Sequence, residues 1–510
     1  NTDNIHNHFV INSVSFKDGY KYYSNLSNTA LLRKTSDEIC EKYGLSVLEE
    51  KTCKSGINFE NFYKKSIKES EYYKFTKEDI DYAIEHSWTY QEFIKKLKDM
   101  GYEVYFRANK ISIRRYPYKR NIRIERAFGE EYSIENIKNK IYSRYPSREE
   151  VIKPKTYDKK LFYKYYKDTN KVNVSFKGKK RNLILIYLES VESSLMSKEN
   201  GGLFNKSRIP ELETLALEND NFSNTNKLGG GKNLTVSSFT MASLVASSSG
   251  TPLDIKIFGG YNEKNKIMPE VKALGDILKE NGYNLKVIQG TDINFSATDQ
   301  YYKIHGDYEI VDYNEMIKKG YVPKGYLEWW GIEDKKMFEI SKKEILETAK
   351  KGMPFAVTMY TMDTHFKDGY LDSECNREFE DQLSNVYACS SKQVMEFVNW
   401  VKEQDFYKDT TIILLGDHYT MQNSYFNRYD NDKRSIYNVF INSGKKISNN
   451  KNRVFTNYDM YPTILSSIGA SIEDNKLGFG VDLYSGNETL AESKGLEYLD
   501  SELKKTAVKE

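Results

Sequence analysis

From residue 182 onward, short apolar runs alternate with longer stretches of helical periodicity. Four runs are apolar almost throughout, which is typical of strands buried on both faces of a sheet. They are 182–188 (NLILIYL), 285–289 (LKVIQ), 354–361 (PFAVTMYT) and 410–415 (TTIILL). Strands that alternate with helices predict an α/β fold, a mainly parallel sheet with helices on both faces.

The N-terminal third has a different pattern. Residues 107–126 (RANKISIRRYPYKRNIRIER) alternate basic and apolar side chains, which predicts strands. Residues 153–181 are dense in Lys and Tyr with little periodicity, so we interpret them as a linker. We therefore expect a smaller α+β domain, a linker, a large α/β domain and a C-terminal tail, at 1–152, 153–181, 182–490 and 491–510.

Charge divides the chain in the same way. The 510 residues carry Lys+Arg 76 against Asp+Glu 73, a net charge of +3, which is too balanced for a protein whose whole surface binds nucleic acid. Residues 1–170 hold 33 basic and 25 acidic residues, whereas residues 171–510 hold 43 and 48. This asymmetry favours two modules with different partners.

Neither the cysteines nor the apolar runs decide the cellular compartment. None of the four cysteines forms a C-x-x-C pair, which excludes a zinc ribbon. Cys375 and Cys389 lie 14 residues apart, and this spacing allows either a disulfide or two separate thiols. No run approaches the roughly 20 apolar residues of a membrane helix, and no signal peptide is visible. Because the first residue is Asn1, we expect the true start to lie upstream.

Side chains that bind metals or transfer protons follow three of the four predicted strands. Glu189 follows the first, His365 stands four residues after the third, and Asp417 and His418 come just after the fourth. In open α/β sheets, ligands bind beyond the carboxyl ends of the strands. Two carboxylates and one imidazole suit Mn²⁺, Mg²⁺ or Zn²⁺.

A hydroxyl nucleophile would fit beside such a metal, because coordination lowers its pKa. Residues 239–247 have helical spacing within a segment rich in Gly, Ser and Thr. A threonine at the start of this helix would face anions, so we predict Thr240 as the nucleophile, with a plain N-cap as the alternative. The LGGGK stretch at 228–232 lacks the spacing of a phosphate-binding P-loop.

Taken in order, the motifs resemble a known family. They are LIYLESVE (185–192), SSFTMASLVASSSGTPL (237–253), LKVIQGTDINFSATDQYYKIHG (285–306), WWGIEDKKMF (329–338), TMDTHFKDGY (361–370), LLGDHY (414–419), NYDMYPTILSSIGA (457–470) and LGFGVDL (477–483). Over about 180–490 the chain resembles the phosphoglycerol transferase and lipoteichoic acid synthase branch of the alkaline phosphatase/sulfatase superfamily.

The resemblance implies a role for each candidate residue. Glu189, Thr240, Asp417 and His418 match the metal ligands, Thr240 matches the nucleophile, and His365 matches a histidine that contacts the phosphoryl group or protonates the leaving group. The family metal is usually manganese. The implied reaction moves glycerophosphate from a phosphatidylglycerol-type lipid to a glycan or polymer hydroxyl through a phospho-threonine. The family's catalytic domain is extracytoplasmic and membrane-associated.

Two departures from the family's usual sequence narrow the resemblance to one type within it. Phe239 stands where the family usually has Trp, and the Gly-Thr-Asp segment at 290–292 lacks the Arg of lipoteichoic acid synthases, which favours the glucan-modifying type. Sulfatases present a Cys or Ser where this chain has Thr240, which disfavours sulfate ester hydrolysis. A phosphodiesterase or sulfatase-type hydrolase is the alternative within the superfamily.

The N-terminal third resembles a second family. His6 and His8 alternate along a β-rich run and so share one face of a strand, a metal-binding geometry, although two surface histidines are the simpler interpretation. The wider sequence resembles mobilisation relaxases of the HUH endonuclease class, which nick single-stranded DNA. In that family, His6 and His8 match two of three metal histidines.

The relaxase resemblance is that of a truncated domain. The third histidine and the catalytic Tyr would lie upstream of Asn1, so we expect no DNA cleavage. Residual binding of single-stranded DNA by residues 1–152 is the alternative function of the chain, since basic strands suit contact with phosphates.

Overall fold

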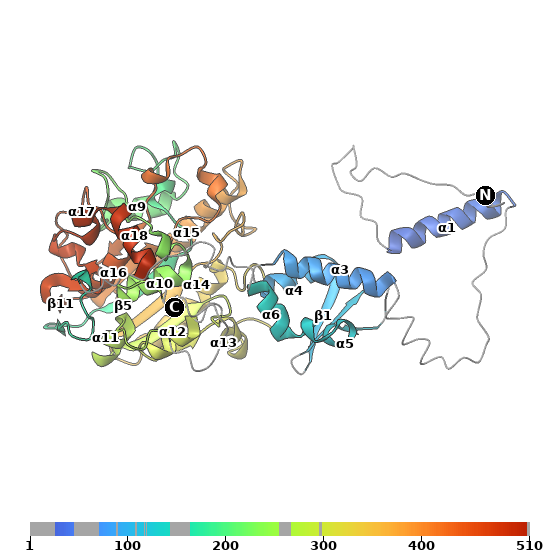
Figure 1. The fold of residues 1–510 in the computed structure, drawn as a ribbon, viewed down its shortest axis with the longest axis horizontal. Helices are drawn as coiled ribbons and strands as arrows, with labels where there is room; N and C mark the ends of the chain where they lie inside the picture. The colour runs from blue at the N-terminus through green and yellow to red at the C-terminus, as the bar shows by residue number, and fades with distance from the viewer. Residues whose placement is uncertain are drawn as a thin grey trace. The chain divides into compact units, whose positions relative to one another are not determined.

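The computed structural model describes residues 26–44, 71–87, 90–107, 110–116, 118, 120–142, 164–253, 267–294 and 298–506. His6 and His8 lie outside the described residues. The chain divides into two compact units, Asn1–Ile141 and Tyr142–Glu510 (Figure 1).

A six-stranded sheet in the order β10-β9-β5-β8-β6-β7 forms the centre of the second unit. Neighbouring strands are parallel except for β9 and β10. The strands are β5 (Asn182–Leu188), β6 (Asn284–Gln289), β7 (Glu309–Val311), β8 (Phe355–Tyr360), β9 (Thr410–Gly416) and β10 (Asn438–Ile441). The four apolar runs are β5, β6, β8 and β9, which confirms the predicted mainly parallel sheet.

The central strands bury side chains on both faces. In β5, Leu183 and Leu185 enter one apolar layer and Ile184 and Ile186 enter the other, which explains why the strand is apolar throughout. The first layer is covered by α10 (Thr240–Ser249), α11 (Leu274–Glu280), α12 (Thr298–Ile304) and α16 (Asn457–Ser467). The second is covered by α9 (Pro210–Glu218), α13 (Tyr313–Lys318), α14 (Asp334–Ala349) and α15 (Gln382–Lys402).

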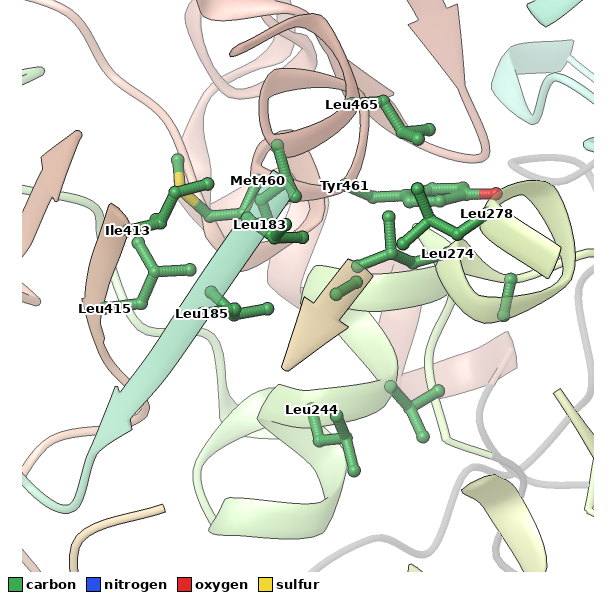
Figure 2. Packing of buried hydrophobic residues seen from close by; sticks show 14 of the residues in the cluster. Leu183, Leu185, Leu244, Leu274, Leu278, Ile413, Leu415, Met460, Tyr461 and Leu465 are labelled. Carbon is green, nitrogen blue, oxygen red and sulfur yellow. The ribbon is translucent and has the colours of Figure 1, made fainter. Parts of the chain in front are cut away.

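Figure 2 shows how the first layer joins elements that are distant in the chain. Leu183 of β5 and Ile413 of β9 face Met460 of α16, while Leu274 of α11 and Leu244 of α10 belong to the same cluster. This packing fixes α10 against the sheet, and α10 begins at Thr240.

Residues 164–181 carry structure where a linker was expected. β4 (Val174–Phe176) pairs antiparallel with β11 (Ala470–Ile472), and Tyr165 and Tyr166 pack against a buried cluster. That cluster also contains side chains of α17 (Leu490–Lys494) and α18 (Leu496–Thr506), so the expected tail belongs to the unit as far as 506. Only a few apolar positions make these contacts, too few to give a periodic pattern. A two-stranded ribbon, β12 (Lys476–Leu477) and β13 (Gly480–Val481), lies between β11 and α17 in the chain.

The first unit contains a three-stranded antiparallel sheet in an α+β arrangement. Its elements are α1 (Leu26–Lys42), α3 (Glu71–Glu85), α4 (Tyr90–Asp99), β1 (Tyr102–Arg107), β2 (Lys110–Arg115), β3 (Ile122–Arg123), α5 (Ile124–Phe128) and α6 (Ile134–Tyr142). The stretch 107–126, predicted as strands, includes β2 and β3, but α5 begins within it. The reason is that only two residues of β3 pair with β2, after which Ile124 is buried as the first residue of a helix.

Two further features bear on the expectations from sequence. Cys375 and Cys389 form a disulfide with their Cα atoms 5.6 Å apart, which selects one of the two alternatives that the spacing allowed. Among the described residues, no helix combines the length and the apolar character that crossing a bilayer requires.

Candidate metal centre

Four of the predicted side chains meet beyond the carboxyl ends of β5 and β9. The Thr240 Oγ1 atom lies 3.1 Å from Glu189 Oε2 and 3.3 Å from His418 Nε2. His418 Nε2 lies 3.5 Å from Glu189 Oε1 and 3.4 Å from Asp417 Oδ2. Glu189, Asp417 and His418 each offer a ligand atom within 4.8 Å of the others. The structure thus brings these four side chains together, and we call them the four-residue cluster.

Adjacent parallel strands bring the two carboxylates to the same place. Leu188 pairs with Gly416, so Glu189 and Asp417 both stand one residue beyond the paired ends. Ser190 has a left-handed φ of 55°, and its N–H donates to Asp417 Oδ1 at 2.8 Å. Such a conformation costs roughly 1–3 kcal/mol, so it persists where the surroundings hold it.

The threonine comes from a helix that the core fixes in place. Thr240 is the first residue of α10 after the N-cap Phe239, and Met241 and Leu244 of the same helix are buried in the first apolar layer. Thr240 itself is only partly buried, whereas Glu189, Asp417 and His418 are buried. The partial positive charge at a helix N-terminus favours an anion beside it.

The electrostatics of the cluster call for a cation. Glu189, Asp417 and His418 are 2%, 1% and 1% exposed, and no Lys or Arg of the described residues forms an ion pair with either carboxylate. Burial raises the pKa of Asp417 to about 7, and the charge of Glu189 adds to the shift. Burial lowers the pKa of His418, but the charges of Asp417 and Glu189 outweigh this and raise it overall.

The donor set fits a divalent metal ion. Within the described residues, Asp417 Oδ2 is buried without a hydrogen-bond partner, whereas Oδ1 accepts the N–H groups of Ser190 and His418. His418 Nδ1 lies 2.8 Å from the Tyr419 carbonyl oxygen, which places a proton on Nδ1 and leaves the Nε2 lone pair toward the cluster. Two carboxylates, a hydroxyl and an imidazole are ligands for Mn²⁺, Mg²⁺ or Zn²⁺.

His365 follows β8, the neighbour of β5 on the other side from β9. The His365 and Trp330 ring centroids are 3.9 Å apart, and His365 Nδ1 lies 2.7 Å from the Phe366 carbonyl oxygen. The preceding residue, Thr364, donates its hydroxyl to the Glu189 carbonyl at 2.5 Å. The backbone of Glu189 therefore joins the four-residue cluster to the segment that carries His365.

Sequence reasoning missed the residues that hold this cluster by its backbone. Thr361 Oγ1 accepts the Glu189 N–H at 3.0 Å, while Ser243 Oγ and Asn457 Nδ2 donate to the Asp417 carbonyl at 2.6 and 2.8 Å. All three residues lie in the stretches that carry the family resemblance. That resemblance was the only available signal, because polar residues in turns have no periodicity that separates a supporting role from a cap.

Comparison with known proteins identifies the class. The sulfatase family model matches residues 181–470, more than half of the chain. The chain therefore belongs to the sulfatase family. A second model, the MobA/VirD2-like relaxase nuclease domain, matches residues 1–45, in agreement with the N-terminal resemblance.

Phosphoglycerol transferase I of Escherichia coli O6:K15:H31 is 31% identical over 336 residues, which are 64% of this chain and 41% of that protein. The chain thus spans less than half the length of this relative. Among solved structures, the lipoteichoic acid synthase LtaP from Listeria monocytogenes aligns with 62% of this chain and 80% of that chain, at 18% identity and a TM-score of 0.48. An alkaline phosphatase superfamily protein from Vibrio parahaemolyticus aligns over 64% and 74%, at 20% identity and 0.46.

Proposed function

We propose that the second unit is a metal-dependent phosphoglycerol transferase. It would move glycerophosphate from a phosphatidylglycerol-type lipid to a hydroxyl of a glycan or polymer. The proposal rests on the hydroxyl of Thr240, a partly buried residue at a helix N-terminus, which lies within 3.3 Å of both Glu189 and His418. Similarity to phosphoglycerol transferase I supports the choice of substrate.

Glu189, Thr240, Asp417 and His418 are the residues that would hold the ion. When bound, a divalent cation, with Mn²⁺ the expected one, lowers the pKa of the Thr240 hydroxyl and neutralises phosphoryl charge. The buried, unpartnered Asp417 Oδ2 supports a metal in this place.

The reaction would proceed in two displacements on the same phosphorus. Thr240 Oγ1 attacks the donor phosphorus, and the bond from phosphorus to the diacylglycerol oxygen breaks. Glu189 Oε2, 3.1 Å from Thr240 Oγ1, takes the hydroxyl proton of Thr240, while His365 protonates the departing oxygen. The product of this step is a glycerophospho-threonine. N–H groups at the start of α10 stabilise its phosphoryl oxygens.

In the second displacement, the acceptor hydroxyl attacks the phosphorus and gives its proton to His365. The bond from phosphorus to Thr240 breaks, and Thr240 takes back the proton held by Glu189. Because the donor is a lipid, the unit would work at a membrane surface, and the proposed location is extracytoplasmic, as in the family.

The test is a Thr240→Ala variant of the full chain, given fluorescent phosphatidylglycerol, Mn²⁺ and a glycan. We expect no diacylglycerol from this variant and a wild-type rate from Thr214→Ala, which changes an exposed threonine of α9. Wild-type activity in Thr240→Ala would show that the nucleophile is another group. Release of free glycerol phosphate by the wild type, equally fast without a glycan, would favour the hydrolase alternative.

We also propose that the first unit binds single-stranded DNA. On the β1–β2 hairpin, Tyr105 pairs with Ser112 and Arg107 pairs with Lys110, so the exposed Tyr105, Arg107 and Lys110 share one face. Aromatic and basic side chains on one sheet face suit bases and phosphates. Fluorescence anisotropy with labelled oligo-dT should show salt-sensitive binding that Arg107→Glu weakens more than Lys98→Glu in α4. Equal binding by both variants contradicts this assignment.

A further inference from the structure

Two aspartates outside the four-residue cluster are buried where β8 ends and α14 begins. Asp334 is the first residue of α14 and is 1% exposed, and Asp363 stands three residues beyond β8 and is 3% exposed. Asp334 Oδ1 accepts the Met362 N–H at 2.7 Å, and Oδ2 accepts the Asp363 N–H at 3.1 Å. In return, Asp363 Oδ1 accepts the Asp334 N–H at 3.2 Å.

These hydrogen bonds hold the turn formed by residues 361–365. This turn bonds both the backbone N–H and the backbone carbonyl of Glu189. The Glu189 N–H donates to Thr361 Oγ1 at 3.0 Å, and the Thr364 hydroxyl donates to the Glu189 carbonyl at 2.5 Å. Met362 and Asp363, whose N–H groups Asp334 binds, are the two residues between these threonines. The Asp334 carboxylate therefore fixes the middle of the segment whose ends hold Glu189.

The same turn carries His365. The His365 N–H donates to the Met362 carbonyl at 3.0 Å, which ties the histidine to the residue that Asp334 binds. Trp330, against which the His365 ring lies, stands four residues before Asp334. A displacement of the 361–365 turn relative to α14 would thus move His365 away from Trp330 as well as loosen Glu189.

We propose that Asp334 is a positioning residue, which holds Glu189 and His365 in their working geometry without touching the substrate. The inference rests on the proposed function for the chemistry of those two residues, and on hydrogen bonds for their placement. The helix N-terminus favours a carboxylate at the first position of α14. Asp334 is therefore anchored by its own helix, and the 361–365 turn depends on it.

The test replaces Asp334 by Asn in the full chain. The amide keeps one acceptor oxygen but turns an N–H₂ group toward the Met362 or Asp363 N–H. Calorimetric titration with Mn²⁺ alone should show a dissociation constant about tenfold higher. Losing a direct partner of a metal ligand costs about 10- to 100-fold, and Asp334 acts on Glu189 one step further out, through the 361–365 turn. In the lipid assay, kcat should fall while KM stays near the wild-type value.

The matched control is Asp482→Asn. Asp482 is also a buried aspartate, 4% exposed, and it accepts the Tyr484 N–H at 3.0 Å, within a segment of the chain separate from the 361–365 turn. It should lose a comparable amount of thermal stability and keep Mn²⁺ affinity. Wild-type Mn²⁺ affinity in Asp334→Asn, or an equal loss of affinity in Asp482→Asn, overturns the proposal.

A second variant keeps the proposal testable if Asp334→Asn does not fold. Thr364→Val removes the hydroxyl that holds the Glu189 carbonyl and keeps the side-chain size, so it should weaken Mn²⁺ binding in the same direction. If Asp334→Asn does not fold and Thr364→Val binds Mn²⁺ normally, the proposal fails. If the wild type binds Mn²⁺ but releases no diacylglycerol, the proposed transferase function is wrong, and the comparison of Mn²⁺ affinities still tests the role of Asp334. If the wild type binds no Mn²⁺, both the proposed function and the proposed role of Asp334 are wrong.

Discussion

Asp334 and Asp363 are buried side by side, yet a neutral replacement should affect them differently. Burial raises the pKa of Asp334 to about 7, and burial together with the charge of Asp334 raises that of Asp363 well above its usual range. Asp334 accepts two N–H groups, whereas Asp363 accepts one, at 3.2 Å. We therefore assign the proton of the pair to Asp363. An asparagine at position 363 is uncharged, as the protonated aspartate is, and can replace it.

We predict that Asp363→Asn changes the pH dependence of stability. An unfolded aspartate ionises near pH 4, whereas native Asp363 stays protonated to higher pH, so the native state binds more protons in between and the wild type loses stability as pH rises. Asparagine does not ionise. Above about pH 4.5, the free energy of unfolding of the variant minus that of the wild type should therefore rise by about 1.4 kcal/mol per pH unit. Urea unfolding between pH 4.5 and 7 measures this, and parallel curves contradict it.

The residues of the cluster differed in how visible they were from sequence. Glu189, Asp417 and His418 directly follow apolar strands, so the strand-end rule located them. Thr361 and Asp334 act through hydrogen bonds to the backbone of segments distant in the chain. Such bonds need only a polar side chain in a turn, which is common everywhere, and the three-dimensional arrangement alone distinguishes them.

At the scale of elements, the junction of β5 and β9 depends on close approach at Gly416. A Cβ atom there would lie 1.9 Å from the Val191 carbonyl oxygen and 3.0 Å from Ile436 Cγ2. Backbone cannot yield like a flexible side chain, so the end of β9 would have to move. That movement would separate Asp417 from the Ser190 N–H.

We predict that Gly416→Ala lowers stability by about 1–3 kcal/mol, the typical cost of overpacking, and weakens Mn²⁺ binding about tenfold or more. Urea unfolding and Mn²⁺ titration of the full chain measure the two effects. Gly178→Ala is the control, because a Cβ atom at Gly178 meets nothing within 4 Å. Unchanged Mn²⁺ binding in Gly416→Ala would show that the junction tolerates displacement.

The elements were predictable where apolar runs were long. The run 182–188 coincides with β5, and 410–415 is β9 with one residue fewer. The antiparallel edge strand β10 and the short β4 were missed, because three or four residues do not establish a period. The three glycines before Lys232 are explained by packing. A Cβ atom at Gly230 would lie 1.7 Å from the Ile436 carbonyl oxygen.

At the scale of the whole molecule, each unit has its own core. The first buries Phe93, Leu97, Ile113 and Ile137, and the second has the two layers on either side of its sheet. Since the four-residue cluster lies entirely in the second unit, its assembly should not require the first.

We therefore predict that a fragment of residues 142–510 folds and binds Mn²⁺ within about twofold of the full chain's affinity. The fragment keeps every residue of the two apolar layers, so it can bury the same apolar surface as the second unit does in the full chain. Circular dichroism, urea unfolding and Mn²⁺ titration check the fragment. A fragment that is soluble only when joined to residues 1–141 would show that the units fold as one.

The left-handed Ser190 and the carboxylate it binds are 227 residues apart in sequence. A nascent chain cannot close this contact until β9 has left the ribosome, and pairing over so long a span is slow. The proposed metal site is consequently assembled late in biosynthesis, after β5, β6, β7, β8 and β9 have been made, and it cannot help to start the sheet. The proposed ion would therefore stabilise only chains in which β5 and β9 have already paired, because a ligand that binds the native site adds nothing to the unpaired chain.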